Sequence, residues 1–199
     1  MAAQTNLDGG VPLRLTPAQG QTLLRLARAA LRHYLAVGEM LPVEADDPDL
    51  QQPAGVFVTL RLRDDLLVPH AGRLRGCIGH IEPDWPLAQV VAAMAVKAAT
   101  RDPRFPPLTL AELDDIAIEI SILSPLQRVE DVSQIEVGRH GLCLQHGRQR
   151  GLLLPQVAVI FGWTREEFLQ NLCRKAGLPW FAWREGELWW FETAVIEEE

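Results

Sequence analysis

The sequence predicts an α+β fold in which an antiparallel sheet packs against helices. Residues 55–62 and 116–123 alternate apolar with polar side chains, the period of a strand that buries one face. Residues 17–37 and 84–100 instead repeat apolar side chains every three or four positions, as a helix with one buried face does. Turn-forming residues break the chain after residue 62, so the stretch 74–80 is expected to return as the antiparallel partner of the first strand.

Length and composition are those of an ordinary globular chain of one domain. The 199 residues carry a net charge of −7, which argues against a general nucleic-acid binder. No apolar run approaches the ~18 residues that a membrane-spanning helix needs, so no membrane partner is expected. Three cysteines without a secretory signal indicate reduced thiols and a cytoplasmic location. Residues 1–14 are expected to form a flexible N-terminal tail.

Capping signals mark the ends of the first two helices. Thr16 and Gln19 form a capping-box pattern at the start of the first helix, and Gly38 is a typical stop. Residues 84–86 open the second helix, which runs into a proline-rich turn over residues 100–107.

Two arginines flank an aspartate in that turn. Arg101 and Arg104 could fix the turn by pairing with Asp102, or could face a carboxylate or phosphate ligand. The sequence favours the structural pairing and leaves the second alternative open.

The second half of the chain mixes short strands with helices. A capping box over residues 109–112 predicts a short helix before the strand 116–123, in which Glu119 and Ser121 face away from the isoleucines. The remaining elements are expected in this order: a hairpin over 141–146 and 150–154, a short helix from Pro155, a helix from Thr164 to Gly177, and a strand over 187–196.

Residues 74–83 gather a thiol, an imidazole, a guanidinium and a carboxylate around two glycines. Gly76 and Gly79 can adopt positive φ or let another backbone or a ligand approach closely. The predicted strand places Cys77, which lies between them, at or just beyond a strand end.

The thiol has two interpretations. A nearby cation, Arg75 or His80, would lower the pKa of Cys77 and make it a nucleophile. Alternatively, Cys77 is a small buried apolar residue, because free cysteines are among the most buried side chains.

Six segments match, in the same order, the motifs of one known family. Through them the chain resembles the AMMECR-domain family, also called AmmeMemoRadiSam system protein A, from Leu15 to the C-terminus. The segments are residues 74–79, 98–105, 119–124, 138–141, 153–158 and 173–178.

The resemblance implies a single AMMECR-type domain over residues 15–199. Such a domain has a larger lobe, here mainly residues 15–130, and a smaller lobe, mainly residues 131–199, with the cysteine motif near the cleft between them. The resemblance also implies a Memo-type protein and a radical S-adenosylmethionine protein as partners. It implies no particular reaction.

One hypothesis is a cysteine-dependent enzyme or enzyme component. Cys77 would be the nucleophile, His80 or His140 the base, and Glu119 the group that orients the imidazole. His80 follows the thiol by three residues, so a bend at Gly79 is needed to bring both to one side.

The alternative hypothesis is a binding or adaptor module without chemistry of its own. The candidate contact residues for a protein partner or a small anionic ligand are Arg75, Gly76, Gly79, Arg101 and Arg104. In the enzyme hypothesis, Arg75 would instead stabilise negative charge.

A zinc site is a third alternative. Cys77 and His80 share their spacing with Cys143 and His146, which superficially resembles paired zinc ligands. The second pair lies in a predicted hairpin strand, where the two side chains diverge. We therefore predict no metal and no cofactor.

Overall fold

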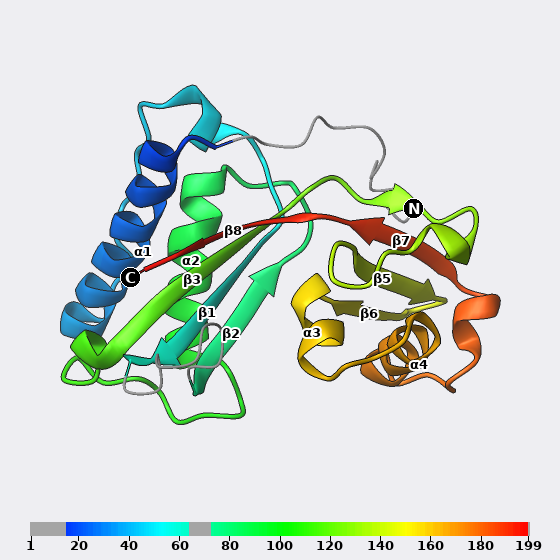
Figure 1. Ribbon diagram of the computed structural model, residues 1–199. Helices are drawn as coiled ribbons and strands as arrows, with labels where there is room; N and C mark the ends of the chain where they lie inside the picture. Colours follow the sequence, from blue (N-terminus) through cyan, green and yellow to red (C-terminus); the bar gives the residue numbers. More distant parts are fainter. Residues whose placement is uncertain (1–14, 64–72, 199) are drawn as a thin grey trace. The chain divides into compact units, whose positions relative to one another are not determined.

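The computed structural model describes residues 15–63 and 73–198, so the predicted tail lies outside the described residues. The described residues form two compact units. The larger unit contains residues 15–63, 73–123 and 194–198, and the smaller unit contains residues 124–193. Together they hold four α-helices and two four-stranded sheets (Figure 1), which confirms the predicted α+β class.

The larger unit is a sheet with helices on one face. Its strand order is β2-β1-β3-β8, and β1 pairs antiparallel with both β2 and β3. Alternate side chains of β1 and β3 join both helices in one apolar core. The elements are α1 (Pro17–Val37), β1 (Val56–Leu62), β2 (Leu74–His80), α2 (Leu87–Thr100), β3 (Ile116–Leu123) and β8 (Thr193–Glu197).

The predicted capping signals of α1 are confirmed. Thr16 and Gln19 form both reciprocal hydrogen bonds of a capping box, and Gly38 ends the helix at φ 79°. The buried stripe of α1 packs on α2, whose alanine-rich surface allows close approach.

The smaller unit has its own sheet and its own core. The sheet order is β4-β7-β5-β6, and Phe168 and Leu172 of α4 pack on Leu142 and Leu144 of β5. The elements are β4 (Gln127–Arg128), β5 (Gly141–His146), β6 (Gln149–Leu153), α3 (Pro155–Ile160), α4 (Arg165–Lys175) and β7 (Glu187–Phe191). Short 3-10 turns also occur at Pro48–Gln51, Leu113–Asp115, Val132–Gln134 and Ala182–Arg184.

The C-terminal strand differs from the prediction. The expected strand over 187–196 is two strands, β7 and β8, which belong to different sheets. The interruption lies at Glu192, whose N–H donates to Ser124 Oγ and whose carbonyl accepts from the Ser124 N–H, both at 2.9 Å. These bonds with the chain entering the smaller unit replace ladder bonds at that residue.

Two smaller expectations also change. Only half of the capping box at Thr109 forms: Glu112 accepts from the Thr109 N–H and hydroxyl, but its own N–H donates to the Thr109 carbonyl, and the 3-10 turn Leu113–Asp115 follows in place of a helix. Cys77 lies in the middle of β2, not at its end. No helix among the described residues is long and apolar enough to span a membrane.

Candidate functional site

The strand register brings Cys77 and Glu119 into one line across the larger sheet. Thr59 of β1 pairs with Cys77 of β2 on one side and with Glu119 of β3 on the other. Ser121 lies two residues beyond Glu119 and therefore on the same face. We call Cys77, Thr59, Glu119 and Ser121 the polar row.

The polar row is buried and partly paired. Thr59, Glu119 and Ser121 are 4%, 5% and 0% exposed, whereas Cys77 is half-buried. The Thr59 hydroxyl donates to Cys77 Sγ at 3.4 Å. The Arg61 guanidinium donates to Glu119 Oε2 from Nη2 at 3.2 Å and from Nε at 3.3 Å.

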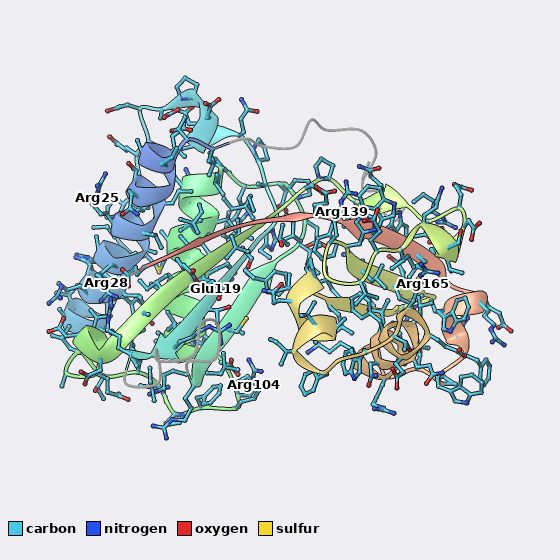
Figure 2. All side chains as sticks on the ribbon, in the orientation of Figure 1. Arg25, Arg28, Arg104, Glu119, Arg139 and Arg165 are labelled. Atoms are coloured by element: carbon cyan, nitrogen blue, oxygen red, sulfur yellow. The ribbon has the colours of Figure 1, made fainter. Side chains whose placement is uncertain are left out.

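Asp102 and Arg104 clamp the backbone of Cys77. β2 is an edge strand, so the outward N–H and C=O of Cys77 have no neighbouring strand to bond. Asp102 Oδ2 accepts from the Cys77 N–H at 2.9 Å, and Arg104 Nη2 donates to the Cys77 carbonyl at 3.5 Å. Arg104 also pairs with Asp102 at 2.6 Å (Figure 2 labels Arg104).

Charge and hydrogen bonding act on Asp102 in the same direction. The hydrogen bonds from Arg104 are the main reason that the pKa of Asp102 falls to about 2, and the Cys77 N–H adds to the effect. The predicted structural pairing in this turn is therefore present for Arg104. Arg101 is exposed, and within the described chain its side chain makes no hydrogen bond or ion pair, although its backbone N–H donates to the Lys97 carbonyl at the end of α2.

The Cys77 thiol is kept protonated by its surroundings. Burial raises the pKa of Cys77 and outweighs the Thr59 hydroxyl and the charge of Arg104, which act in the opposite direction. The charges of Glu119 and Asp102 raise the pKa further. The local cation does not produce the thiolate that the nucleophile hypothesis requires.

Gly76 and Gly79, on either side of Cys77, allow close packing against β2 and do not bend the strand. Neither Gly76 nor Gly79 has a positive φ. A Cβ on Gly76 would lie 2.2 Å from the carbonyl oxygen of Ala98 in α2, and one on Gly79 would lie 2.3 Å from Cδ1 of Phe57. Close packing of the helix and of the Phe57 ring against β2 therefore requires glycine at both positions.

The structure does not bring His80 to Cys77. Both residues belong to the uninterrupted strand β2, and a separation of three residues places them on opposite faces. His80 Nε2 contacts Asp84 Oδ1 at 2.6 Å, and its ring lies 5.3 Å from that of Trp85. The bend at Gly79 that the enzyme hypothesis needs is absent.

His140 lies in the smaller unit and is committed to local contacts. Its Nδ1 accepts from the Glu136 N–H at 3.1 Å, and its ring stacks on Trp190 at 4.3 Å. Burial is the main reason that its pKa is lowered, so the ring is neutral near pH 7. These contacts fit a residue that orders the loop before β5.

Arg75 is also committed to the fold. It is 8% exposed, pairs with Glu112 at 3.0 Å and donates to the Pro106 carbonyl at 2.9 Å. It therefore ties the segment after α2 to the edge strand.

Cys143, from the second pair of the proposed zinc pattern, has an arginine as its partner. Cys143 is buried in β5, and Arg150 Nε donates to its sulfur at 3.3 Å. In the part of the chain that the structure describes, no three His, Cys, Asp or Glu side chains gather as metal ligands would.

Sequence reasoning missed Thr59 and Ser121 as members of the site. Alternation along β1 and β3 placed each of them on the polar face of its strand. Only the strand register, which pairs Thr59 with Cys77, 18 residues along the chain, and with Glu119 of β3, brings them to the same face as Cys77.

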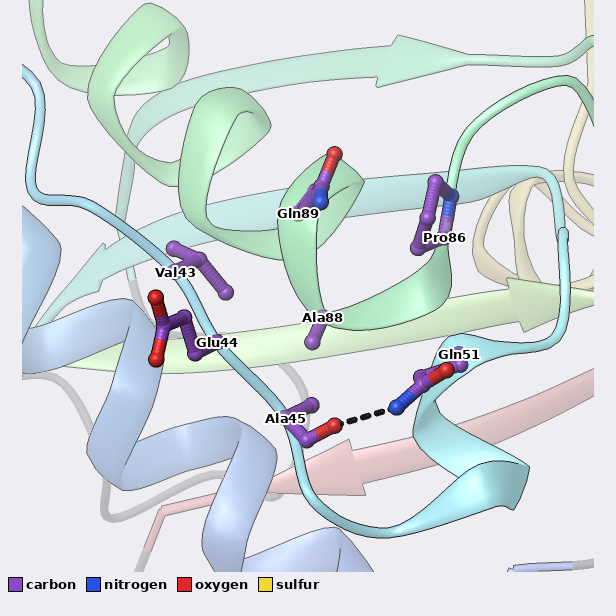
Figure 3. Close-up of a pocket in the computed structure, with 7 residues that line it drawn as sticks. All are labelled: Val43, Glu44, Ala45, Gln51, Pro86, Ala88 and Gln89. Atoms are coloured by element: carbon purple, nitrogen blue, oxygen red, sulfur yellow. Dashed lines mark hydrogen bonds between the residues drawn. The ribbon is translucent and has the colours of Figure 1, made fainter.

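A surface hollow of about 280 Å³ lies elsewhere on the larger unit, between the segment before β1 and the start of α2 (Figure 3). Glu44 is the one titratable residue of its lining, and Gln51 Nε2 donates to the Ala45 carbonyl at 2.5 Å. No member of the polar row lines it.

Comparison with known proteins gives consistent matches over nearly the whole chain. Residues 24–196 match the family model AMMECR1. A protein of Methanopyrus kandleri is 43% identical over 195 residues, covering 94% of this chain and 91% of that protein. A protein of Thermofilum pendens is 47% identical over 184 residues, covering 88% and 86%. The crystal structure of the uncharacterized protein PH0010 from Pyrococcus horikoshii has a TM-score of 0.86 and 40% identity, covering 93% of this chain and 94% of that one.

Proposed function

The chain belongs to the AMMECR1 family, and we propose that it acts as a binding component for Memo-type and radical S-adenosylmethionine proteins, without catalysis by Cys77. The partners follow from the family resemblance, and the observation that supports a role without thiol catalysis is the surroundings of Cys77. The thiol has a raised pKa, accepts a hydrogen bond from Thr59, and lies in a strand whose backbone is fixed by Asp102 and Arg104.

A thiolate enzyme needs features that this setting does not supply. A catalytic thiol requires a base within hydrogen-bonding distance or a cation strong enough to lower its pKa. His80 contacts Asp84, and Arg104 is held mainly by Asp102. A rigid strand edge with an exposed arginine turn suits recognition of another surface better than it suits proton transfer.

The turn that follows α2 is the proposed contact. The Arg104 side chain is 53% exposed although its guanidinium also pairs with Asp102. Arg101 is exposed in the same turn. Arg is common at protein interfaces because it combines a planar charge with several donors. We propose that an acidic surface of the partner contacts these two side chains.

The test is a binding measurement with purified Memo-type and radical S-adenosylmethionine proteins from the same organism. Cys77→Ser should keep the dissociation constant within about twofold, because the thiol takes no part. Arg101→Glu should weaken binding about tenfold or more, since like charges then face each other. Arg25→Glu, an exposed reversal on α1 with the same change in net charge, is the matched control (Figure 2).

Three results would contradict the proposal. Absence of binding to both purified proteins would remove them as partners. Equal weakening by Arg101→Glu and Arg25→Glu would remove the turn as the contact. Loss of binding in a folded Cys77→Ser variant would mean that the function requires the thiol.

A further inference from the structure

We propose that the polar row binds a small neutral ligand through a carboxamide-type edge, with Glu119 Oε1 accepting an N–H and Ser121 Oγ pairing with the adjoining group. This inference goes beyond the partner binding proposed above and does not depend on it. It rests on hydrogen-bonding capacity that the larger unit leaves unused.

Two buried polar atoms of the row have no partner. Among the described residues, three buried side-chain oxygen or nitrogen atoms lack a hydrogen bond: Glu119 Oε1, Ser121 Oγ and Trp183 Nε1. The first two lie on one face of β3, two residues apart. Buried polar groups are nearly always satisfied, so two neighbouring exceptions indicate a place where another molecule completes the bonds.

The charge of the site favours a neutral ligand. Arg61 already neutralises Glu119 through two hydrogen bonds to Oε2, so a cationic ligand would leave an excess charge in a buried place. An anionic ligand would face the unpaired Oε1. A neutral N–H donor satisfies Oε1 without either cost.

The hydroxyl and the neighbouring ring define the rest of the ligand. Ser121 Oγ both donates and accepts, so it matches either the carbonyl or the second N–H of a carboxamide. Phe57 pairs with Ser121 across the strands, and its ring lies over Gly79. Phe57 and Cys77 are half-buried, whereas Thr59, Glu119 and Ser121 are buried, so the ligand's body would contact the ring while its polar edge reaches β3.

Benzamide is the appropriate probe because it joins a flat apolar ring to a neutral carboxamide. We expect it to shift the backbone amide resonances of Thr59, Glu119 and Ser121 saturably in ¹H–¹⁵N spectra of the full chain. Benzoate, which has the same ring but no N–H donor, should not do so. Ser121→Ala and Glu119→Gln should each weaken benzamide binding about fivefold or more, the factor that one hydrogen bond supplies.

Stability of the free protein separates a ligand site from a structural role. Ser121→Ala should leave the melting temperature of the free protein unchanged or raise it, because the hydroxyl it removes has no partner. Ser133→Ala, at an exposed serine of the smaller unit, is the control for benzamide binding.

Either of two outcomes overturns the inference. One is the absence of saturable shifts with benzamide in the unaltered protein. The other is equal benzamide affinity in Ser121→Ala and in the unaltered protein; a melting temperature lowered by the same substitution would then mean that the hydroxyl serves the fold. If Glu119→Gln does not fold, the Ser121→Ala pair of measurements decides alone.

Discussion

At the scale of the residue, Cys77 shows how surroundings outweigh neighbours in sequence. Arg75 lies two residues before it in the chain, yet its guanidinium pairs with Glu112, and the cationic influence on the thiol comes from Arg104. Burial then decides the protonation state. A motif that gathers a thiol with cations does not by itself produce a thiolate.

We predict that Cys77 reacts slowly with iodoacetamide at pH 7. A thiol whose pKa lies above its ordinary value holds about 1% thiolate or less at that pH, and the thiolate is the reactive form. The measurement is the alkylation rate of the peptide that contains Cys77, followed by mass spectrometry from pH 6 to 10. Thr59→Val should move the profile to higher pH, because it removes the hydroxyl that donates to the sulfur.

The control is glutathione under the same conditions. A Cys77 rate at pH 7 above that of glutathione, with a profile that is level from pH 7 upward, would show a stabilised thiolate. That result would favour the enzyme hypothesis over the binding proposal.

At the scale of the element, the hydrogen bonds of Asp102 to β2 and Arg104 make the free energy of unfolding depend on pH. The pKa of Asp102 is about 2 in the folded protein and about 4 in an unfolded chain. A lowered pKa gives stability that is complete above the unfolded value and is lost as the pH falls toward the folded value. Asp102 should therefore contribute about 2 kcal/mol at neutral pH, and this contribution should disappear between pH 4 and pH 2.

Asp102→Asn tests this assignment. The free energy of unfolding in urea should be lower at pH 6 for the variant than for the unaltered protein, and the two should converge by about pH 2. Asp46→Asn, at an exposed carboxylate on the segment before β1, should leave both the value and its pH dependence nearly unchanged. Parallel pH curves for the unaltered protein and Asp102→Asn would refute the clamp.

Local sequence patterns predicted which elements form better than they predicted where each element begins and ends. Helical periodicity identified both long helices, and alternation with turn residues identified β1, β3 and the β5–β6 hairpin, because these signals act within a few residues. The division between β7 and β8 could not be predicted, since it depends on bonds between Glu192 and Ser124, 68 residues apart. For the same reason the sequence identified Cys77 and Glu119 as candidates without their link through Thr59.

At the scale of the whole molecule, the chain leaves the larger unit at residue 123 and returns to it with β8. Glu198, the residue after β8, binds to other parts of the larger unit. Its carboxylate accepts from Arg28 of α1, from Arg63 Nη2 at 3.1 Å and from the Ile118 N–H at 3.1 Å. One side chain thus ties the end of the described chain to the first helix and the central strands.

We predict that Glu198→Ala lowers the free energy of unfolding by about 2 to 3 kcal/mol, because it removes a carboxylate that two mostly buried arginines share. The matched control is Asp114→Ala, which removes the partner of Arg32 from a pair whose side chains are 57% and 80% exposed. That exposed pair should be worth less than about 1 kcal/mol. Both values come from urea unfolding at pH 7. Equal losses in the two variants would mean that Glu198 contributes no more than a surface pair, and β8 would then be held by its strand pairing and apolar contacts alone.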